Sequence, residues 1–265
     1  MIFKVVNADN VSQQAWDSFI KIHRQSTVLH TQKMYAILQS VCGYEPYALF
    51  CLDNVGGIQA MLLGYLHTPI SGLGSFLSRR SVIPQSPLYS TASDLTALLA
   101  VYEKFIKRKA IYTEIRNHII DDSVAEVFFA QGFKFEEHLN FIVDCSMPEA
   151  AWKKISESKR RQIKKAQKQG VNIIEDPTEE QVRSFYLILK KIYAEKIKKP
   201  LAPYEYFLNL HKAGSDEYGC KFLLVEYQAE IIGGMVALIS GTRVIHEHYI
   251  AGLDVEYKEQ YPSVM

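Results

Sequence analysis

The sequence predicts an α/β (α+β) protein with two tandem copies of one domain, each with a mixed central sheet flanked by helices. Amphipathic helices alternate with apolar hairpins, a pattern typical of sheets covered by helices. The helical pattern around Ser18 and Phe19 returns around Ser184 and Phe185, and the strand led by Ile58 returns as a strand led by Ile231. Recurrence of helix, helix, strand, turn and strand in one order indicates a duplicated domain.

The first copy is predicted over residues 1–145. A capping hydroxyl opens its first helix, a Gly-rich turn divides its hairpin, and Gly132 ends its last helix. We expect helices at 11–23, 33–41, 93–108 and before Gly132, a hairpin at 47–66, and strands at 75–83, 110–117 and 133–145.

The second copy is predicted over residues 146–265. A capping box of Ser146 and Glu149 and a stop at Gly170 predict one helix over 147–169. Further helices are expected at 178–191 and 204–213, a hairpin at 221–240, and a strand at 242–254. Because this copy ends after its third strand, we expect a truncated second domain and a chain that is part of a longer protein.

Composition excludes several classes of protein. Hydrophobic residues make up 48% and charged residues 22%, which is typical of soluble globular proteins, and no apolar run or basic leader suggests a membrane span or signal peptide. A cytoplasmic location is expected, with the four cysteines as reduced core thiols. The net charge of +1 argues against broad coating of a polyanion and leaves only local contacts.

The segment KRRQIKKAQKQG, residues 159–170, concentrates positive charge. On a helix, Arg161, Lys164, Lys165 and Lys168 share one face. Such a face is often merely solvated, but no acidic residue follows Glu157 to make pairs along the helix. We therefore expect this face, with Arg160, to bind substrate phosphate or tRNA.

Several motifs together resemble a known family. They are WDSFI (16–20), HTQKMYAIL (30–38), GYEP (43–46), TEIRN (113–117), GFKFEEHLNFIVD (132–144), RRQIKKAQKQGV (160–171) and HEHYIAGLDVEYKEQYPS (246–263). Their order is similar to that of the FemABX family, tandem GNAT-fold acyltransferases that add amino acids to peptidoglycan precursors and form interpeptide bridges such as the glycines of lipid II. The peptidoglycan enzymes with long coiled-coil arms carry an insertion that this sequence lacks.

The resemblance implies the partners. The donor would be aminoacyl-tRNA, and the acceptor a nucleotide- or lipid-linked sugar precursor, with possible peripheral contact with the inner membrane surface through a lipid-linked substrate. In the family an Arg of the basic segment contacts substrate phosphate, and Arg160 or Arg161 would match it.

The strand at 242–254 carries the expected catalytic residues. Alternation places Glu247 and Tyr249 on one side and His246 and His248 on the other. Glu247 is the candidate proton acceptor and Tyr249 the candidate hydrogen-bond donor to the oxyanion. His246 and His248 could supply an imidazole base or could be partly buried packing residues. They lack a third ligand nearby, so no metal is expected.

The stretch YKEQYPSVM follows that strand, where GNAT acetyltransferases bind the coenzyme A diphosphate through a glycine-rich loop. Here Tyr261 and Ser263 replace glycines, and Pro262 has no N–H to donate. An acyl-coenzyme A donor is therefore disfavoured, and no cofactor is expected.

The expected strands of the first copy contain six polar residues, whose role the sequence leaves open. They either pair with one another in the core, or Arg116 and Asn140 bind the acceptor. The six residues are Arg80, Glu114, Arg116, Asn117, His138 and Asn140.

Three functions remain compatible with the sequence. The favoured one is aminoacyl transfer from tRNA to an amine of a cell-wall or surface-glycan precursor. The second is N-acyl transfer from acyl-coenzyme A to an amino sugar in polysaccharide biosynthesis. The third is a non-catalytic duplicate that binds tRNA or precursor.

Overall fold

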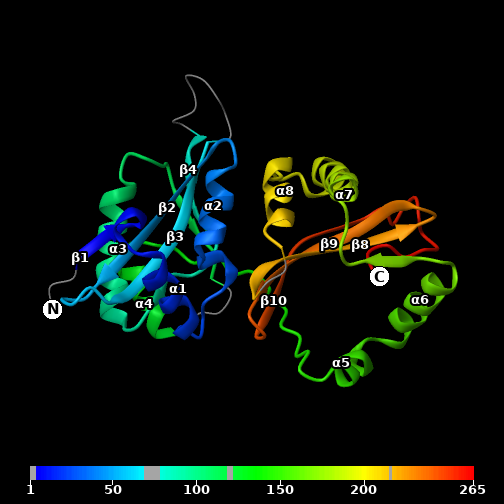
Figure 1. Ribbon diagram of the computed structural model, residues 1–265, viewed down its shortest axis with the longest axis horizontal. Helices are drawn as coiled ribbons and strands as arrows, with labels where there is room; N and C mark the ends of the chain where they lie inside the picture. Colours follow the sequence, from blue (N-terminus) through cyan, green and yellow to red (C-terminus); the bar gives the residue numbers. More distant parts are fainter. Residues whose placement is uncertain (1–3, 69–77, 118–121, 215–216) are drawn as a thin grey trace. The chain divides into compact units, whose positions relative to one another are not determined.

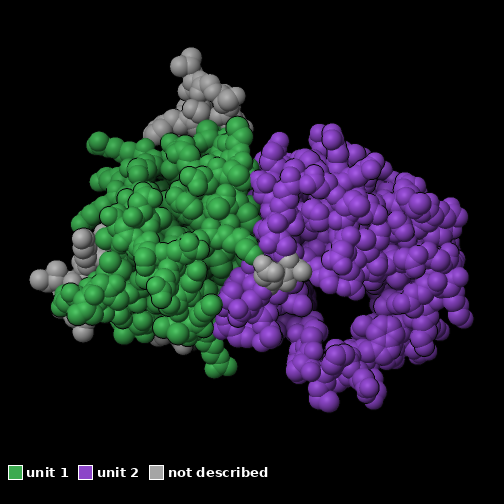
Figure 2. Space-filling view, viewed as in Figure 1, with its two compact units in different colours: residues 1–138 green, residues 139–265 purple. Residues whose placement is uncertain are grey.

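The computed structural model describes residues 4–68, 78–117, 122–214 and 217–265. The chain divides into two compact units, residues 1–138 and 139–265 (Figure 2). This division lies N-terminal to the boundary predicted between residues 145 and 146. Each unit holds one sheet with helices packed against it, which confirms the predicted fold class (Figure 1).

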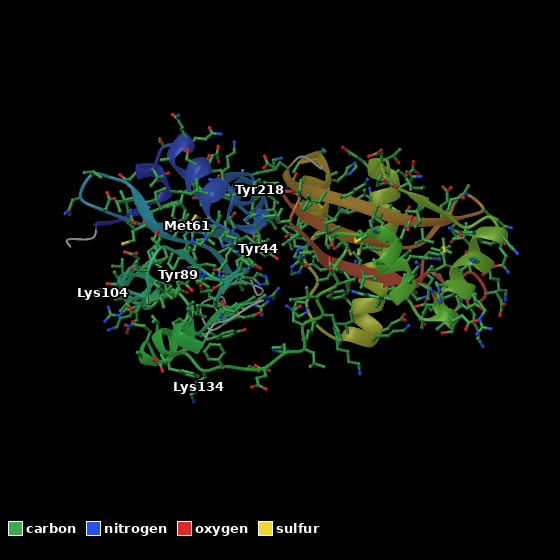
Figure 3. All side chains as sticks on the ribbon, turned by 90° about the horizontal axis from the view of Figure 1, so that it is seen from below. Tyr44, Met61, Tyr89, Lys104, Lys134 and Tyr218 are labelled. Carbon is green, nitrogen blue, oxygen red and sulfur yellow. The ribbon has the colours of Figure 1, made fainter. Side chains whose placement is uncertain are left out.

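Unit 1 is built on a mixed sheet in the order β1-β2-β3-β4-β6, with β5 paired to β3. Among the described strands of this sheet, β4 and β6 run parallel and the other pairs are antiparallel. Figure 3 shows Met61 on β3 and Tyr89 on β5, two strands that pair. The strands are β1 (Lys4–Asn7), β2 (Tyr44–Leu52), β3 (Ile58–His67), β4 (Arg80–Ile83), β5 (Leu88–Tyr89) and β6 (Thr113–Ile115).

Helices cover both faces of this sheet. Alternate residues of β2 point to opposite faces: Phe50 contacts Trp16 of α1, whereas Leu49 packs in a core that includes Leu98 of α3. The second face also receives α4. The helices are α1 (Gln13–Ile22), α2 (Gln32–Gln39), α3 (Ala92–Ile106) and α4 (Asp122–Ala130), with single 3₁₀ turns η1 (Ala8–Asn10) and η2 (Val28–His30).

The β2–β3 hairpin is fixed by its turn. The Asp53 carboxylate accepts hydrogen bonds from the N–H groups of Val55 at 2.9 Å and Gly57 at 2.8 Å. Gly56 between them has φ +88°, which favours glycine. The turn therefore sets the strand register, with Tyr44 opposite His67 at the far end.

A chain of hydroxyl groups crosses the core of unit 1. Ser81 Oγ lies 2.6 Å from Tyr47 Oη and 2.7 Å from Tyr102 Oη, and Tyr102 Oη lies 2.7 Å from Thr113 Oγ1. These bonds join β2, β4, α3 and β6, and they satisfy polar groups that burial would otherwise penalise. Burial raises the pKa of Tyr102, so it remains a neutral donor.

Unit 2 repeats the arrangement of unit 1 in the order strand, two helices and three antiparallel strands. Its sheet has the order β10-β9-β8-β7. The repeat predicted from the sequence is thus present as a repeat of topology. The strands are β7 (Asn172–Ile174), β8 (Tyr218–Tyr227), β9 (Glu230–Ser240) and β10 (Val244–Gly252); the helices are α5 (Pro148–Lys154), α6 (Glu157–Lys168), α7 (Glu179–Ile192), its π-helical extension η4 (Tyr193–Ile197) and α8 (Tyr204–Lys212).

The single helix expected over 147–169 is wrong, because the chain breaks at Ile155 into α5 and α6. Ser156 adopts an extended backbone and accepts the N–H of Lys159, so its side chain starts a new helix instead of continuing the old one. The expected capping box also fails, since Met147 caps α5 without a side-chain hydrogen bond.

The strands expected at 133–145 are absent from this described stretch, which contains no helix or strand. Phe133 packs against the core of unit 1, but the apolar side chains from residue 139 to residue 143 are open to solvent, with Leu139 91% and Phe141 85% exposed. Apolar alternation forms a strand only where a neighbouring strand pairs with it, and this segment joins the two units outside both sheets. The expectation of four core cysteines is also wrong, because Cys42 and Cys145 are exposed.

The buried His30 makes the stability of unit 1 dependent on pH. Its Nε2 donates to the Ser86 carbonyl at 2.8 Å and its Nδ1 accepts the Thr27 N–H at 3.0 Å, so both ring nitrogens are satisfied in the neutral form. Desolvation by burial lowers the pKa of His30 from 6.5 to about 4. Between these values the unfolded chain binds the proton and the folded chain does not, so stability falls as pH falls through this window.

We expect the free energy of unfolding of unit 1 to drop by about 2 kcal/mol between pH 7 and 5, and by about 3 kcal/mol in total by pH 4. Urea unfolding followed by Trp16 fluorescence measures this in a Trp152→Phe background, since Trp16 donates to the His30 carbonyl. His30→Gln should remove the drop, and the exposed His138→Gln should keep it. Equal stability at pH 7 and 5 in the parent protein would contradict the assignment.

Candidate functional site

The edge strand β10 carries the expected catalytic residues of unit 2. A β-bulge interrupts its pairing with β9: Glu247 lies opposite Ala237 and Tyr249 opposite Val236, with His248 as the extra residue. The regular alternation predicted for this strand therefore fails at the bulge. Glu247 is exposed, whereas His248 and Tyr249 are half-buried.

His248 and Tyr249 join an aromatic cluster with α8. Tyr206 is buried and its hydroxyl lies 3.0 Å from His248 Nε2. The Tyr249 ring meets Phe207 edge-on with centroids 4.8 Å apart. The bulge thus brings an imidazole, a phenol and a carboxylate to one short stretch of strand, where groups able to move a proton or donate a hydrogen bond are available.

Two cationic side chains of the basic helix α6 interact with other residues of unit 2. The Arg160 guanidinium donates to the carbonyls of Trp152 at 3.5 Å and Lys153 at 3.2 Å, and so caps the end of α5. Lys165 forms an ion pair with Glu259, which raises the pKa of Lys165, and lies over the Tyr261 ring. Five cations of α6 were expected to bind phosphate or tRNA. Two of them, Arg160 and Lys165, instead make close contacts with other residues of unit 2.

The remaining cations of that face are more accessible. Arg161 lies 4.0 Å from Glu157, a long and exposed pair. Lys164 and Lys168 are exposed and have no ion pair with another described residue. The part of the α6 surface that can meet an external anion is therefore centred on these three residues.

The segment 253–265 folds back on α6 and the β8–β9 hairpin. The Asp254 carboxylate accepts the Ser263 N–H at 3.0 Å and the Ser263 hydroxyl at 2.5 Å. Tyr257 and Tyr261 pack against a core that includes Ala166 and Ile232. A cleft of about 280 Å³ between this segment and α6 is lined by Lys159, Gln162, Asp254, Lys258, Tyr261, Ser263 and Val264.

The conformation of the segment 253–265 is unfavourable for binding a diphosphate. A diphosphate cradle needs free backbone N–H groups. Here the Ser263 N–H already donates a hydrogen bond to the Asp254 carboxylate. The negative charge of Asp254 would also repel an anion that approached this N–H.

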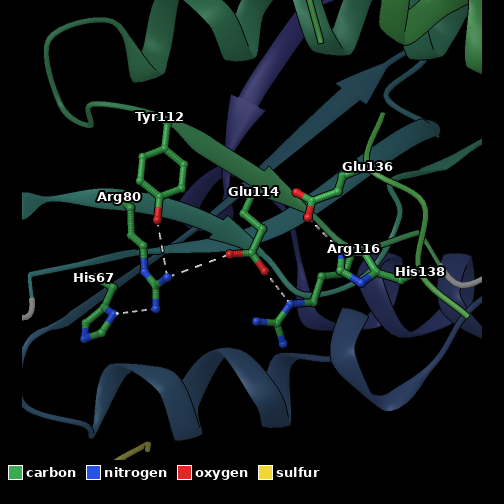
Figure 4. A network of polar contacts seen from close by, with 7 residues as sticks. All are labelled: His67, Arg80, Tyr112, Glu114, Arg116, Glu136 and His138. Carbon is green, nitrogen blue, oxygen red and sulfur yellow. Dashed lines mark hydrogen bonds and ion pairs between the residues drawn. The ribbon is translucent and has the colours of Figure 1, made fainter. Parts of the chain in front are cut away.

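Unit 1 contains a network of polar side chains on one face of its sheet (Figure 4). Glu114 lies between two guanidinium groups: its Oε1 is 2.8 Å from Arg116 Nε, and its Oε2 is 3.8 Å from Arg80 Nη1. Three of the six polar residues noted in the sequence therefore pair with one another. His138 lies 3.7 Å from Glu136 in the same view, with both side chains exposed.

The two residues expected to bind an acceptor differ in their surroundings. Arg116 belongs to the Glu114 network just described. Asn140 lies in the irregular segment after unit 1 and is exposed. Contrary to the strand predicted there, no regular element positions Asn140.

Several residues of these sites carry no distinctive motif in the sequence. Tyr206 sits in an ordinary amphipathic helix, and its hydrogen bond to His248 spans 42 residues. Asp254 gives no signal beyond lying nine residues before Ser263. His67 is marked only by its place at the end of an otherwise apolar strand.

No protein-family model matches the chain, and no curated protein matches it. Among solved structures, the crystal structure of FemX is similar over 98% of this chain and 83% of its own, with a TM-score of 0.67 and 15% identity. The chain therefore has the FemX fold, which confirms the FemABX-like fold expected from the sequence.

Two weaker similarities accompany it. L-PGS from Bacillus licheniformis has a TM-score of 0.47 and 11% identity, over 95% of this chain and 72% of its own. The aminoglycoside 6'-N-acetyltransferase AAC(6')-Ih from Acinetobacter baumannii has a TM-score of 0.37 and 12% identity, over 54% of this chain and 97% of its own.

Metal-binding clusters and membrane-spanning helices are both absent from the described ranges. Residues 4–68, 78–117, 122–214 and 217–265 contain no cluster of His, Cys, Asp and Glu placed to hold a metal ion. Across the same ranges, no helix combines the length and apolar character that a membrane span requires.

Proposed function

We propose that the protein is an acyltransferase that moves an amino acid from aminoacyl-tRNA to an amine of a cell-wall or surface-glycan precursor. The observation that carries this proposal is the FemX fold over nearly the whole chain. The proposal extends what the family resemblance of the sequence implies, and the acceptor would be a nucleotide- or lipid-linked sugar in the cytoplasm. A lipid-linked acceptor would bring the protein to the inner surface of the membrane.

Features of unit 2 support aminoacyl-tRNA as the donor. The exposed cations Arg161, Lys164 and Lys168 suit the phosphates of tRNA. The ester that links an amino acid to tRNA is already activated, so the protein has little further activation to supply. Acyl-coenzyme A is the second candidate, and the commitment of the Ser263 N–H to Asp254 disfavours it.

The reaction would take place at β10. The amine attacks the ester carbonyl, the new amide bond forms, and the tRNA hydroxyl leaves with a proton. Glu247, exposed at the bulge, would accept the proton of the amine, and Tyr249 would donate a hydrogen bond to the oxyanion. His248, held by Tyr206, is the rival proton acceptor.

Removing three charges from α6 tests tRNA binding. We expect the combined variant Arg161→Gln, Lys164→Gln, Lys168→Gln to bind charged tRNA more weakly, because three phosphate contacts are lost. The slope of log affinity against log salt should fall by about 2. Filter binding at a series of KCl concentrations measures both quantities.

The matched control removes three exposed lysines from unit 1, namely Lys104→Gln, Lys107→Gln and Lys134→Gln, with the same change in net charge. This control should keep the parent slope. An α6 variant with the parent affinity and slope would contradict the proposal, as would acetyl-coenzyme A binding much tighter than about 1 mM, an affinity worth about 4 kcal/mol.

Replacing Glu247 tests the proton acceptor. We expect Glu247→Gln to lower kcat by about 100-fold with little change in donor KM, because a carboxamide cannot take the proton. Single-turnover transfer measures the chemical step, and Glu180→Gln on the exposed face of α7 serves as the control. Loss of activity in His248→Gln with full activity in Glu247→Gln would instead assign the proton to the Tyr206–His248 pair.

A further inference from the structure

The guanidinium of Arg80 is half-buried and poorly satisfied within unit 1. Its contacts are long: Nη1 lies 3.4 Å from Tyr112 Oη and 3.8 Å from Glu114 Oε2, and Nη2 lies 3.4 Å from His67 Nδ1. Its Nε is sealed from solvent and has no hydrogen-bond partner among the described residues. The side chain as a whole is 26% exposed, so the rest of it can still be reached from outside.

Arg80 shares the carboxylate of Glu114 with a second guanidinium. Among the described residues, the Glu114 carboxylate contacts both guanidiniums, and it binds Arg116 closely and Arg80 only at long range (Figure 4). Burial and the positive charge of Arg80 lower the pKa of His67, so the ring stays neutral, adds no further positive charge and can accept a hydrogen bond from Arg80. Among the described residues, Glu114 therefore approaches Arg80 only at long range.

Neutral hydroxyl groups surround the cations. Tyr44 and Tyr65 stack with ring centroids 4.5 Å apart, and Tyr44 lies opposite His67, which lies opposite Arg80. Burial raises the pKa of both tyrosines, so they keep their O–H groups as possible donors. The side chains contributed by four neighbouring strands are thus mainly hydrogen-bond donors and cations.

Such an arrangement is costly without an anion. A half-buried guanidinium loses part of its hydration, and only a close acceptor restores the lost free energy. Folded proteins satisfy nearly all buried polar groups, so the unpaired Nε marks Arg80 as poorly satisfied within unit 1. An acceptor from outside would bind the exposed part of this side chain and not the sealed Nε. The planar fork of Arg matches the two oxygens of a carboxylate or a phosphate.

We propose that Arg80 and Arg116 form a binding site for an oxyanion of the acceptor substrate, a carboxylate or a phosphate group, with Glu114 as the positioning residue that holds the two guanidiniums. The assignment of this oxyanion to the acceptor rests on the proposed function; the anion site itself does not. The anion would give Arg80 a close acceptor, because the Glu114 carboxylate lies 3.8 Å away.

Titration of the full chain with small anions tests the site directly. The arginine Nε–Hε groups are followed by ¹⁵N-resolved NMR while inorganic phosphate, inorganic diphosphate or succinate is added at constant ionic strength. We expect saturable shifts of the Arg80 and Arg116 signals. Tighter binding of the inorganic anions identifies a phosphate, and tighter binding of succinate identifies a carboxylate.

Variants separate the site from a general charge effect. Arg80→Gln should weaken anion binding at the Arg116 signal by at least about tenfold, because a charged hydrogen-bond donor is lost. Arg80→Lys keeps the charge without the fork and should bind with intermediate affinity. Lys104→Gln, an exposed residue of α3 with the same loss of charge (Figure 3), should bind as the parent does.

Shifts that stay linear with all three anions, or affinity that is equal in the parent and Arg80→Gln, would overturn the site. Neither result depends on a donor or on turnover, so the site can fail while aminoacyl transfer holds. Conversely, saturable binding at Arg80 in a protein that transfers no amino acid would leave the anion site standing and remove the proposed function.

Discussion

The long antiparallel hairpins β2–β3 and β8–β9 are the pairings on which the rest of each unit depends. Both are buried along most of their length, so their side chains must be apolar on both faces and their polar backbone must be paired throughout. This requirement places helices on the sheet of each unit. It also fixes the register, because a slip of one residue would exchange the two faces.

The charged side chains of both candidate sites lie where that burial ends. In unit 1, Tyr44 and His67 occupy the open end of the hairpin, and Arg80 is next to them on β4. In unit 2, the edge strand β10 leaves the regular pleat at a bulge, where Glu247 becomes exposed and His248 meets Tyr206. Both candidate sites therefore lie where the sheet of the unit is no longer buried.

The sequence predicted the hairpins and most helices correctly, because their apolar spacing and caps are local signals. Thr178 and Gln181, for example, form the capping box at the start of α7. The break between α5 and α6 was missed because the Ser156 cap competes with an otherwise continuous helical pattern. The strands predicted at 133–145 are absent from the structure, because a strand needs a pairing partner that no local pattern can supply.

The candidate sites were predictable only in part. Glu114 and Arg116 can be recognised in the sequence as charged residues in an apolar stretch. The long contacts of Arg80 cannot, because they depend on distances between strands. The positive face of α6 follows from helical spacing. The ion pair between Lys165 and Glu259 could not be predicted from helical spacing, because the two residues meet only when the segment 253–265 folds back.

The most direct test of the account is the fate of the acyl group in a single turnover. Full chain is mixed with acceptor precursors and either tRNA charged with a labelled amino acid or labelled acetyl-coenzyme A, and alkali-stable label is counted, since an ester is cleaved by alkali and the new amide is not. The account predicts that label moves from charged tRNA to the precursor as an amide. Transfer from acetyl-coenzyme A alone, or no transfer to any precursor from either donor, would contradict it.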